Sequence, residues 1–166
     1  NMTYVKYIER TRDYYLSQGY DQSYQWAQLD DVPFTTLKKP LAQSRITLIS
    51  TGEIAIRFDP DSGDDPMEKT QVGNIYSIPS AIDPDRLYSH SYAYDRFATN
   101  LDDLNSFFPV TRLHEAVAAG RLGSMAARLH SGHYTYSQRK TLERDAPEVL
   151  KRCREDGVDV AVLVPI

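Results

Sequence analysis

The sequence predicts an α/β domain with a mostly parallel sheet and flanking helices, three-layered and Rossmann- or flavodoxin-like. Three observations predict it: a β-branched run at residues 45–51 (RITLIST), an apolar run at residues 158–166 (VDVAVLVPI), and a helical segment that enters the second run through an Asp156-Gly157 turn. Continuous apolar runs are typical of parallel strands covered on both faces. We expect the two runs to be central neighbours in a sheet left incomplete at the C-terminus. A sheet cut there leaves an open edge, so residues 158–166 should lie at an exposed rim or under a second copy.

Length and charge restrict the class of protein. A chain of 166 residues predicts one main domain, which we place at residues 45–166 after an N-terminal helix and irregular arm at residues 1–44. The net charge of -4 gives no electrostatic reason to expect nucleic acid or an anionic membrane as a partner. No apolar run reaches the ~20 residues of a membrane span, and charged residues interrupt the N-terminus where a signal peptide would be apolar. These features predict a cytoplasmic protein.

The N-terminal segment combines a helix with an irregular arm. Aromatic and aliphatic residues recur at near-helical spacing over residues 3–17, and Gly19 marks the expected end of this helix. Such an aromatic stripe favours packing against the body of the protein or a second copy over a ligand cage. Residues 20–44 show no clear periodicity and predict an ordered, irregular arm.

The strand at residues 45–51 ends in hydroxyl residues and a glycine, which suits a site. Thr51, Gly52 and Glu53 follow it, with the glycine allowing a tight turn and the hydroxyl able to bond a ligand or the next turn. A phosphate loop is not indicated, because the further glycines and the lysine of that motif are missing. The aspartate-rich segment at residues 58–66 lacks the fixed spacing of oxygen ligands that a calcium-binding EF-hand loop requires. We therefore expect an exposed acidic loop.

A short strand at residues 75–78 precedes the densest polar run, residues 87–109. It contains His90, Tyr94 and Asp95, and histidine beside carboxylates suits proton transfer or metal binding. Metal spacings such as HxH and HExxH are absent, so we expect no metal site. A hydrogen-bonded structural loop and a substrate-binding loop remain equal alternatives for this run.

The C-terminal half predicts two helices separated by an extended segment. The first covers residues 110–119 and closes at Gly120; the second covers residues 137–156, with Asp145 as a possible cap before Pro147. Between them, His130 and His133 would share a face and suit a metal only in a helix, whereas the Tyr-Thr-Tyr alternation after Gly132 favours extended structure.

The single cysteine, Cys153, excludes an internal disulfide and a CxxC motif within this chain. Its basic neighbours could lower the pKa of its thiol, but an ordinary residue on a helix face is the favoured interpretation.

Several ordered motifs resemble one protein family. They are LIST-G at residues 48–52, the acidic segment ending at Asp65-Pro66, SHSYAYD at 89–95, DLNSFFPVTRLHEAVAAGRLGSMAARLHS at 103–131, and APEVLKRCREDGVDVAVLVPI at 146–166. Together they resemble the selenocysteine- or cysteine-containing subunit of D-proline reductase and, more broadly, the B components of glycine, sarcosine and betaine reductases. The resemblance covers residues 46–166, and the FFPxxRL and GRLGS elements are its most specific parts.

The resemblance implies a reductase that cleaves a C–N bond of an amino acid with a dithiol as reductant. In that family the strand similar to VLVP leads into a redox motif in which selenocysteine or cysteine precedes a second cysteine. Selenocysteine is encoded by UGA, so we expect the reading frame to have been ended at such a codon just after Ile166. No catalytic residue or cofactor is then expected within this chain, which alone would be inactive.

The same resemblance implies the site and the partners. This chain would supply pocket walls for an amino-acid substrate, formed by Thr51, Gly52, Glu53, His90, Tyr94, Asp95 and His130. A second reductase subunit with a pyruvoyl group is an expected partner, and we expect a homo-oligomer. The competing hypothesis is a non-catalytic assembly or binding subunit that keeps the family fold and pairs through its tyrosine-rich N-terminal helix.

Overall fold

The computed structural model describes residues 6–23, 28–33, 35–59, 61, 71–92, 94, 97, 100–133, 135 and 137–166. The chain forms two compact units, residues 1–35 and 36–166. In the first unit, helix α1 (Tyr7–Ser17) confirms the predicted helix over its described part, and it has no buried residue. The predicted acidic loop falls mostly outside the described residues, at positions 60 and 62–66. No helix in the described ranges is long and apolar enough to cross a membrane.

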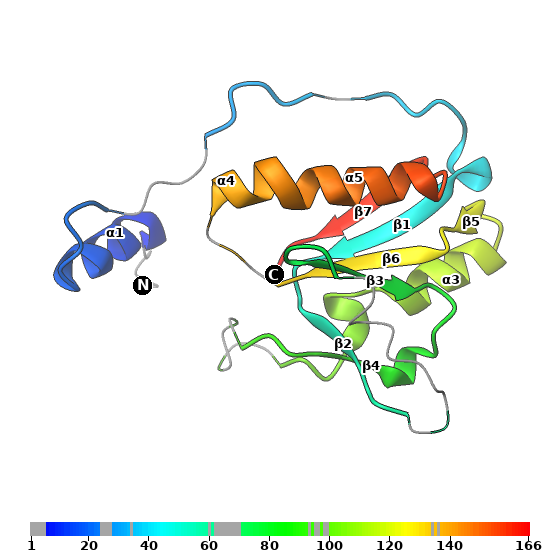
Figure 1. Ribbon diagram of the computed structural model, residues 1–166, viewed down its shortest axis with the longest axis horizontal. Coiled ribbons are helices and arrows are strands. Elements are labelled where there is room, and N and C mark those ends of the chain that lie inside the picture. The colour runs from blue at the N-terminus through cyan, green and yellow to red at the C-terminus, as the bar shows by residue number, and fades with distance from the viewer. Residues whose placement is uncertain are drawn as a thin grey trace, which may run out of the picture. The chain divides into compact units, whose positions relative to one another are not determined.

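The second unit is a mixed α/β domain whose main sheet is mostly parallel, as predicted (Figure 1). Strand β1 (Arg45–Ser50) runs parallel to β5 (Ser124–Met125), β6 (Arg128–Gly132) and β7 (Val160–Val164). Strand β3 (Ile75–Pro79) pairs antiparallel with β6 on the far side from β1. The carboxyl ends of β1, β6 and β7 therefore point the same way.

The two strands expected to be neighbours do pair, but one of them is not central. Five residue pairs join β1 and β7, from Ile46 opposite Val160 to Ser50 opposite Val164. Within the described residues β7 pairs with β1 alone, and Leu163 is 70% exposed. The expected central position of β7 is wrong, because within the described residues it pairs along one edge only, and its side chains are half-buried or exposed. The expected exposed rim is confirmed.

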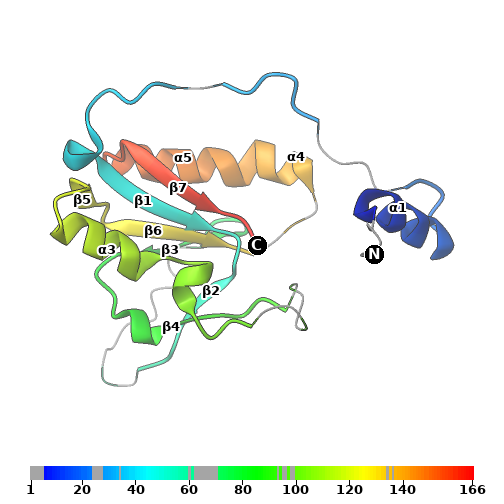
Figure 2. The ribbon, with the colours of Figure 1, turned by 180° about the vertical axis from the view of Figure 1, so that it is seen from behind.

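Helices lie on both faces of the sheet (Figures 1 and 2). Helix α3 (Val110–Ala118) covers one face, and the left-handed Gly120 (φ 68°) ends it as predicted. The core on this side consists of Leu48, Ile54, Tyr76, Ile78, Leu87, Phe107, Phe108, Val110 and Leu129. Removing such side chains from water is the main favourable contribution to folding.

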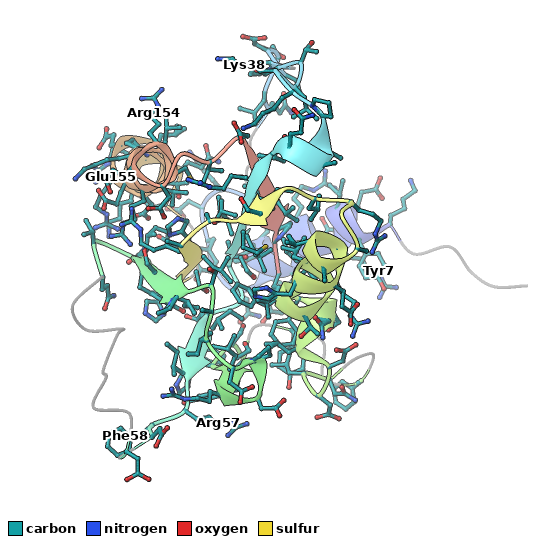
Figure 3. The ribbon with its side chains drawn as sticks, turned by 90° about the vertical axis from the view of Figure 1, so that its right-hand side faces the viewer. Tyr7, Lys38, Arg57, Phe58, Arg154 and Glu155 are labelled. Atoms are coloured by element: carbon teal, nitrogen blue, oxygen red, sulfur yellow. The ribbon has the colours of Figure 1, made fainter. Side chains whose placement is uncertain are left out.

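The other face carries a continuous helical segment made of α4 (Gln138–Lys140), the π-helical η4 (Thr141–Asp145) and α5 (Ala146–Glu155). The predicted cap at Asp145 is wrong: its backbone is helical and its side chain makes no capping bond. Its carboxylate instead pairs with Arg144 at 2.8 Å and accepts a hydrogen bond from the Asn74 N–H. Figure 3 shows Arg154 and Glu155 on the outer side of α5.

Short elements that the sequence pattern did not predict connect these layers. Strands β2 (Ile54–Ile56) and β4 (Leu87–Ser89) form a separate antiparallel pair. Single turns of 3-10 helix occur at η1 (Leu41–Gln43), η2 (Pro84–Arg86) and η3 (Leu104–Ser106). Because β2 starts directly after Glu53, the chain turns sharply at the carboxyl end of β1.

Candidate functional site at the carboxyl ends of the strands

Two parallel strands, β1 and β6, deliver polar groups to the same end of the sheet, where α/β proteins usually bind ligands. Thr51, Gly52 and Glu53 follow β1, Ser131 lies near the end of β6, and His133 follows that strand. We call these five residues the strand-end site. The predicted residues Thr51, Gly52 and Glu53 are thus brought together with two that the sequence analysis did not assign to a site.

Glu53 and His133 form a carboxylate–imidazole pair at the centre of the strand-end site. The Glu53 Oε1 lies 3.0 Å from the His133 Nδ1, with 11% of the glutamate side chain exposed and 46% of the histidine side chain. Glu53 has φ 49°, the left-handed region, and is the one non-glycine residue with positive φ in the described ranges. A side chain makes this conformation costly, by about 1–3 kcal/mol, and such strain is concentrated at functional sites.

A hydrogen-bonded floor lies beneath this pair. The Ser131 hydroxyl donates to the Ser50 carbonyl at 3.2 Å and accepts from the Ile54 N–H at 3.0 Å. The Tyr76 hydroxyl lies 3.2 Å from the same oxygen, and its ring packs against His133. Burial raises the pKa of Tyr76 to about 12, with the charge of Glu53 adding to the effect and the Ser131 bond opposing it. Tyr76 is therefore a neutral hydroxyl at neutral pH.

The end of β7 is attached to the same site. The Ile166 N–H donates to the Thr51 hydroxyl at 2.9 Å, and this hydroxyl also contacts the Ile166 carbonyl at 3.4 Å. At Gly52 a β-carbon would lie 2.5 Å from the Ile166 Cδ1 and 3.4 Å from the Phe107 ring. The absence of a side chain at Gly52 therefore lets Ile166 lie directly against the exit of β1.

The predicted residues of the polar run reach the site only in part. The His90 N–H donates to the Glu53 carbonyl at 3.0 Å, while the His90 Nε2 lies 2.9 Å from the Tyr88 hydroxyl. His90 thus helps to hold Glu53 through its backbone. Tyr94 is half-buried in an irregular segment, and Asp95 lies outside the described residues.

His130 is not brought to the strand-end site. It is fully buried between the sheet and α5, where its Nδ1 lies 3.1 Å from the Ser77 hydroxyl. Burial and the charges of Arg152 and Arg128 lower its pKa to about 4. Successive residues of a strand point to opposite faces, which places His130 on one side of β6 and Ser131 on the other.

The alternation of side chains along an extended segment is the sequence signal that could have placed Ser131 and His133 in one site. In extended structure these two residues share a face, whereas a shared face for His130 and His133 requires a helix. The extended alternative was the correct one over Arg128–Gly132. Within the described part of the chain, no group of three histidine, cysteine, aspartate or glutamate residues could hold a metal ion.

An apolar concave feature, distinct from the strand-end site, lies between α5 and the strands β1 and β7. It is an apolar groove of about 470 Å³, with walls formed by Ile49, Ile75, Val149, Leu150, Val160, Ala161 and Leu163 among others. Cys153 also borders it, and burial raises the pKa of its thiol. A thiol pKa lowered by the basic neighbours is therefore wrong for Cys153, and the favoured interpretation, an ordinary residue of the helix, agrees with its burial.

No family model, curated protein or solved structure matches this chain. A buried carboxylate paired with a half-exposed imidazole can hold a proton and transfer it to a group bound at the surface. Neighbouring hydroxyl and backbone groups can orient that bound group.

Proposed function

We propose that this chain is the N-terminal portion of a selenol- or thiol-dependent reductase subunit that acts on D-proline or a glycine-type amino acid. The observation that carries this proposal is the attachment of Ile166 to Thr51, two residues before Glu53, whose carboxylate pairs with His133. A redox residue following Ile166, as the resemblance implies, would emerge next to a group able to transfer protons. The rest of a Rossmann- or flavodoxin-like fold would follow it.

The proposal gives each part of the strand-end site a role. Thr51 and Gly52 fix the position of the chain that leads to the redox residue, and Glu53 and His133 provide acid–base chemistry. His90, Tyr94 and Asp95 belong to the segment that would form the substrate wall. A selenolate or thiolate supplies the nucleophile, because the ionised form is the reactive one.

The proposed partners follow from the same chemistry. A second subunit with a pyruvoyl group would activate the amine of the substrate, and a dithiol would regenerate the redox pair. We place this enzyme in the cytoplasm, where dithiols are kept reduced. None of the five strand-end residues lines the apolar groove.

Two experiments test the function. Sequencing the gene past Ile166 should show a UGA codon followed by a frame that encodes a cysteine-containing helix. The read-through protein, with its pyruvoyl partner and a dithiol, should then reduce D-proline or a glycine-type substrate. The matched control is the same protein with alanine at the redox position. Unrelated or stop-dense downstream sequence, or no reduction of any such substrate, would contradict the proposal.

One observation favours a second candidate function, a non-catalytic assembly subunit. The outer edge of β7 is unpaired within the described residues, and Leu163 and Leu150 expose apolar surface beside it. Open strand edges and contiguous apolar surface are typical of interfaces. Reductase activity of the read-through protein would separate this candidate from the first.

A further inference from the structure

Glu53 has a side chain where the backbone favours glycine. Its φ of 49° lies in the left-handed region, which glycine adopts without strain. The conformation is held by the surrounding backbone, because the Glu53 carbonyl accepts the His90 N–H and β2 begins at the next residue. The carboxylate must then contribute something that glycine would lack.

That contribution is the contact with His133. The Glu53 carboxylate lies 3.0 Å from the His133 Nδ1, and an ionised carboxylate can only accept a hydrogen bond. The proton of a neutral ring is therefore held on Nδ1, leaving the lone pair on Nε2. The Nε2 has no hydrogen-bond partner in the described ranges, and nearly half of the side chain is exposed.

The other three of the four histidines are in different situations. His130 is fully buried against Ser77, and His114 uses its Nε2 to contact the Ser80 carbonyl at 2.8 Å. The His90 Nε2 lies against the Tyr88 hydroxyl. His133 alone among them combines a carboxylate on one ring nitrogen with exposure of the ring.

We propose that His133 is the proton-transfer residue of the strand-end site and that Glu53 is its positioning residue, which fixes Nε2 as the reacting nitrogen. The proton transfer rests on the proposed reductase function, whereas the position of the ring proton does not. The backbone strain at Glu53 is retained because it directs the carboxylate to Nδ1.

The step balances as a reductive cleavage of the substrate C–N bond. As the bond breaks, its electron pair stays on nitrogen, and the proton on Nε2 of the protonated His133 forms the new N–H bond. The dithiol supplies two electrons and two protons and becomes a disulfide. The two electrons and one of these protons form the new C–H bond at the substrate carbon, and the other proton returns His133 to its protonated form.

The first test uses the 166-residue chain and does not depend on activity. In ¹⁵N-histidine spectra, the neutral His133 ring, identified by its loss in His133→Gln, should be protonated on Nδ1. Glu53→Gly removes the carboxylate and also relieves the left-handed backbone, so it should retain thermal stability while the proton moves to Nε2. Glu115→Gln, an exposed carboxylate on α3, is the control and should change neither.

Either of two results from this test would overturn the proposal. One is a His133 proton that stays on Nδ1 in Glu53→Gly. The other is a large loss of thermal stability in that variant, which would assign the carboxylate a structural role.

The second test uses the read-through reductase. His133→Gln should lower kcat by about 100-fold or more, the usual contribution of a general acid, and Glu53→Gly by about 10-fold. Unchanged kcat in His133→Gln would refute the catalytic role. If the unsubstituted enzyme reduces no substrate, the proposed function fails, while the ¹⁵N spectra still decide whether Glu53 positions His133.

Discussion

His130 shows how one buried side chain makes stability depend on pH. It is enclosed between β6 and α5, its Nε2 has no hydrogen-bond partner in the described part of the chain, and Arg152 and Arg128 oppose its protonation. These causes lower its pKa to about 4, against about 6.5 for an unfolded chain. Between these values the unfolded state binds more protons than the folded state.

We expect His130 to destabilise the fold as the pH falls from 6.5 to 4. The free energy of unfolding should fall by about 3 kcal/mol in total: it is highest above pH 6.5, decreases between pH 6.5 and 4, and reaches its full loss below about pH 4. Urea denaturation across this range should show a shallower pH dependence for His130→Gln than for the unsubstituted chain. The control is His114→Gln, and an identical slope in His130→Gln would refute the prediction.

At the scale of elements, arginines fasten α5 to the sheet. Arg152 is 4% exposed, and its guanidinium donates to Glu148 at 2.7 Å and to the Ser77 hydroxyl of β3 at 2.8 Å. Arg128 of β6 donates to Asp156, just past the helix, at 2.8 and 2.9 Å, and this bond lowers the pKa of the Asp156 carboxyl. The C-terminal end of the helix is therefore held to both β3 and β6.

Breaking the buried attachment should be costly. We expect Arg152→Met to lower the free energy of unfolding by about 3 kcal/mol, because Glu148 and Ser77 lose a partner. Arg154→Met, on the outer side of the same helix (Figure 3), should change it by less than about 0.5 kcal/mol. Equal midpoints in urea for the two variants would show that the Arg152 contacts contribute nothing.

The open edge of β7 is also an element-scale property. Residues Val160–Val164 have neither charge nor proline to discourage pairing with another strand. We therefore expect the chain to self-associate through this edge, and Leu163→Lys to weaken the association at least about tenfold. Sedimentation at several concentrations measures this, with Leu29→Lys in the first unit as control. Equal association of the two variants would exclude the β7 edge as the interface.

At the scale of the whole molecule, the stable part is the second unit. Every residue of the main hydrophobic core lies within residues 36–166, and α1 buries none of its side chains. A chain that lacks residues 1–35 should therefore unfold cooperatively with a Tm within about 3 °C of the full chain. Calorimetry on both chains tests this, and loss of the cooperative transition would show that the first unit is required.

The sequence by itself determined the elements with strong local signals. The β-branched run before Thr51, the helix that ends at Gly120 and the apolar run of β7 can be recognised because periodicity and terminating residues are local properties. Strands β2 and β4 have three residues each, too few to show a period. The π-helical turn before α5 also has no such signal, so Asp145 was mistaken for a cap.

Only the tertiary structure decided which polar residues act together. Glu53 and His133 are 80 positions apart, and their contact exists because β1 and β6 are parallel neighbours with ends that meet. The same geometry separates His130 from His133, because residues an odd number of positions apart in an extended chain point to opposite faces of the sheet. The edge position of β7 was likewise decided by strand order, which depends on contacts between distant segments and not on the composition of the strand.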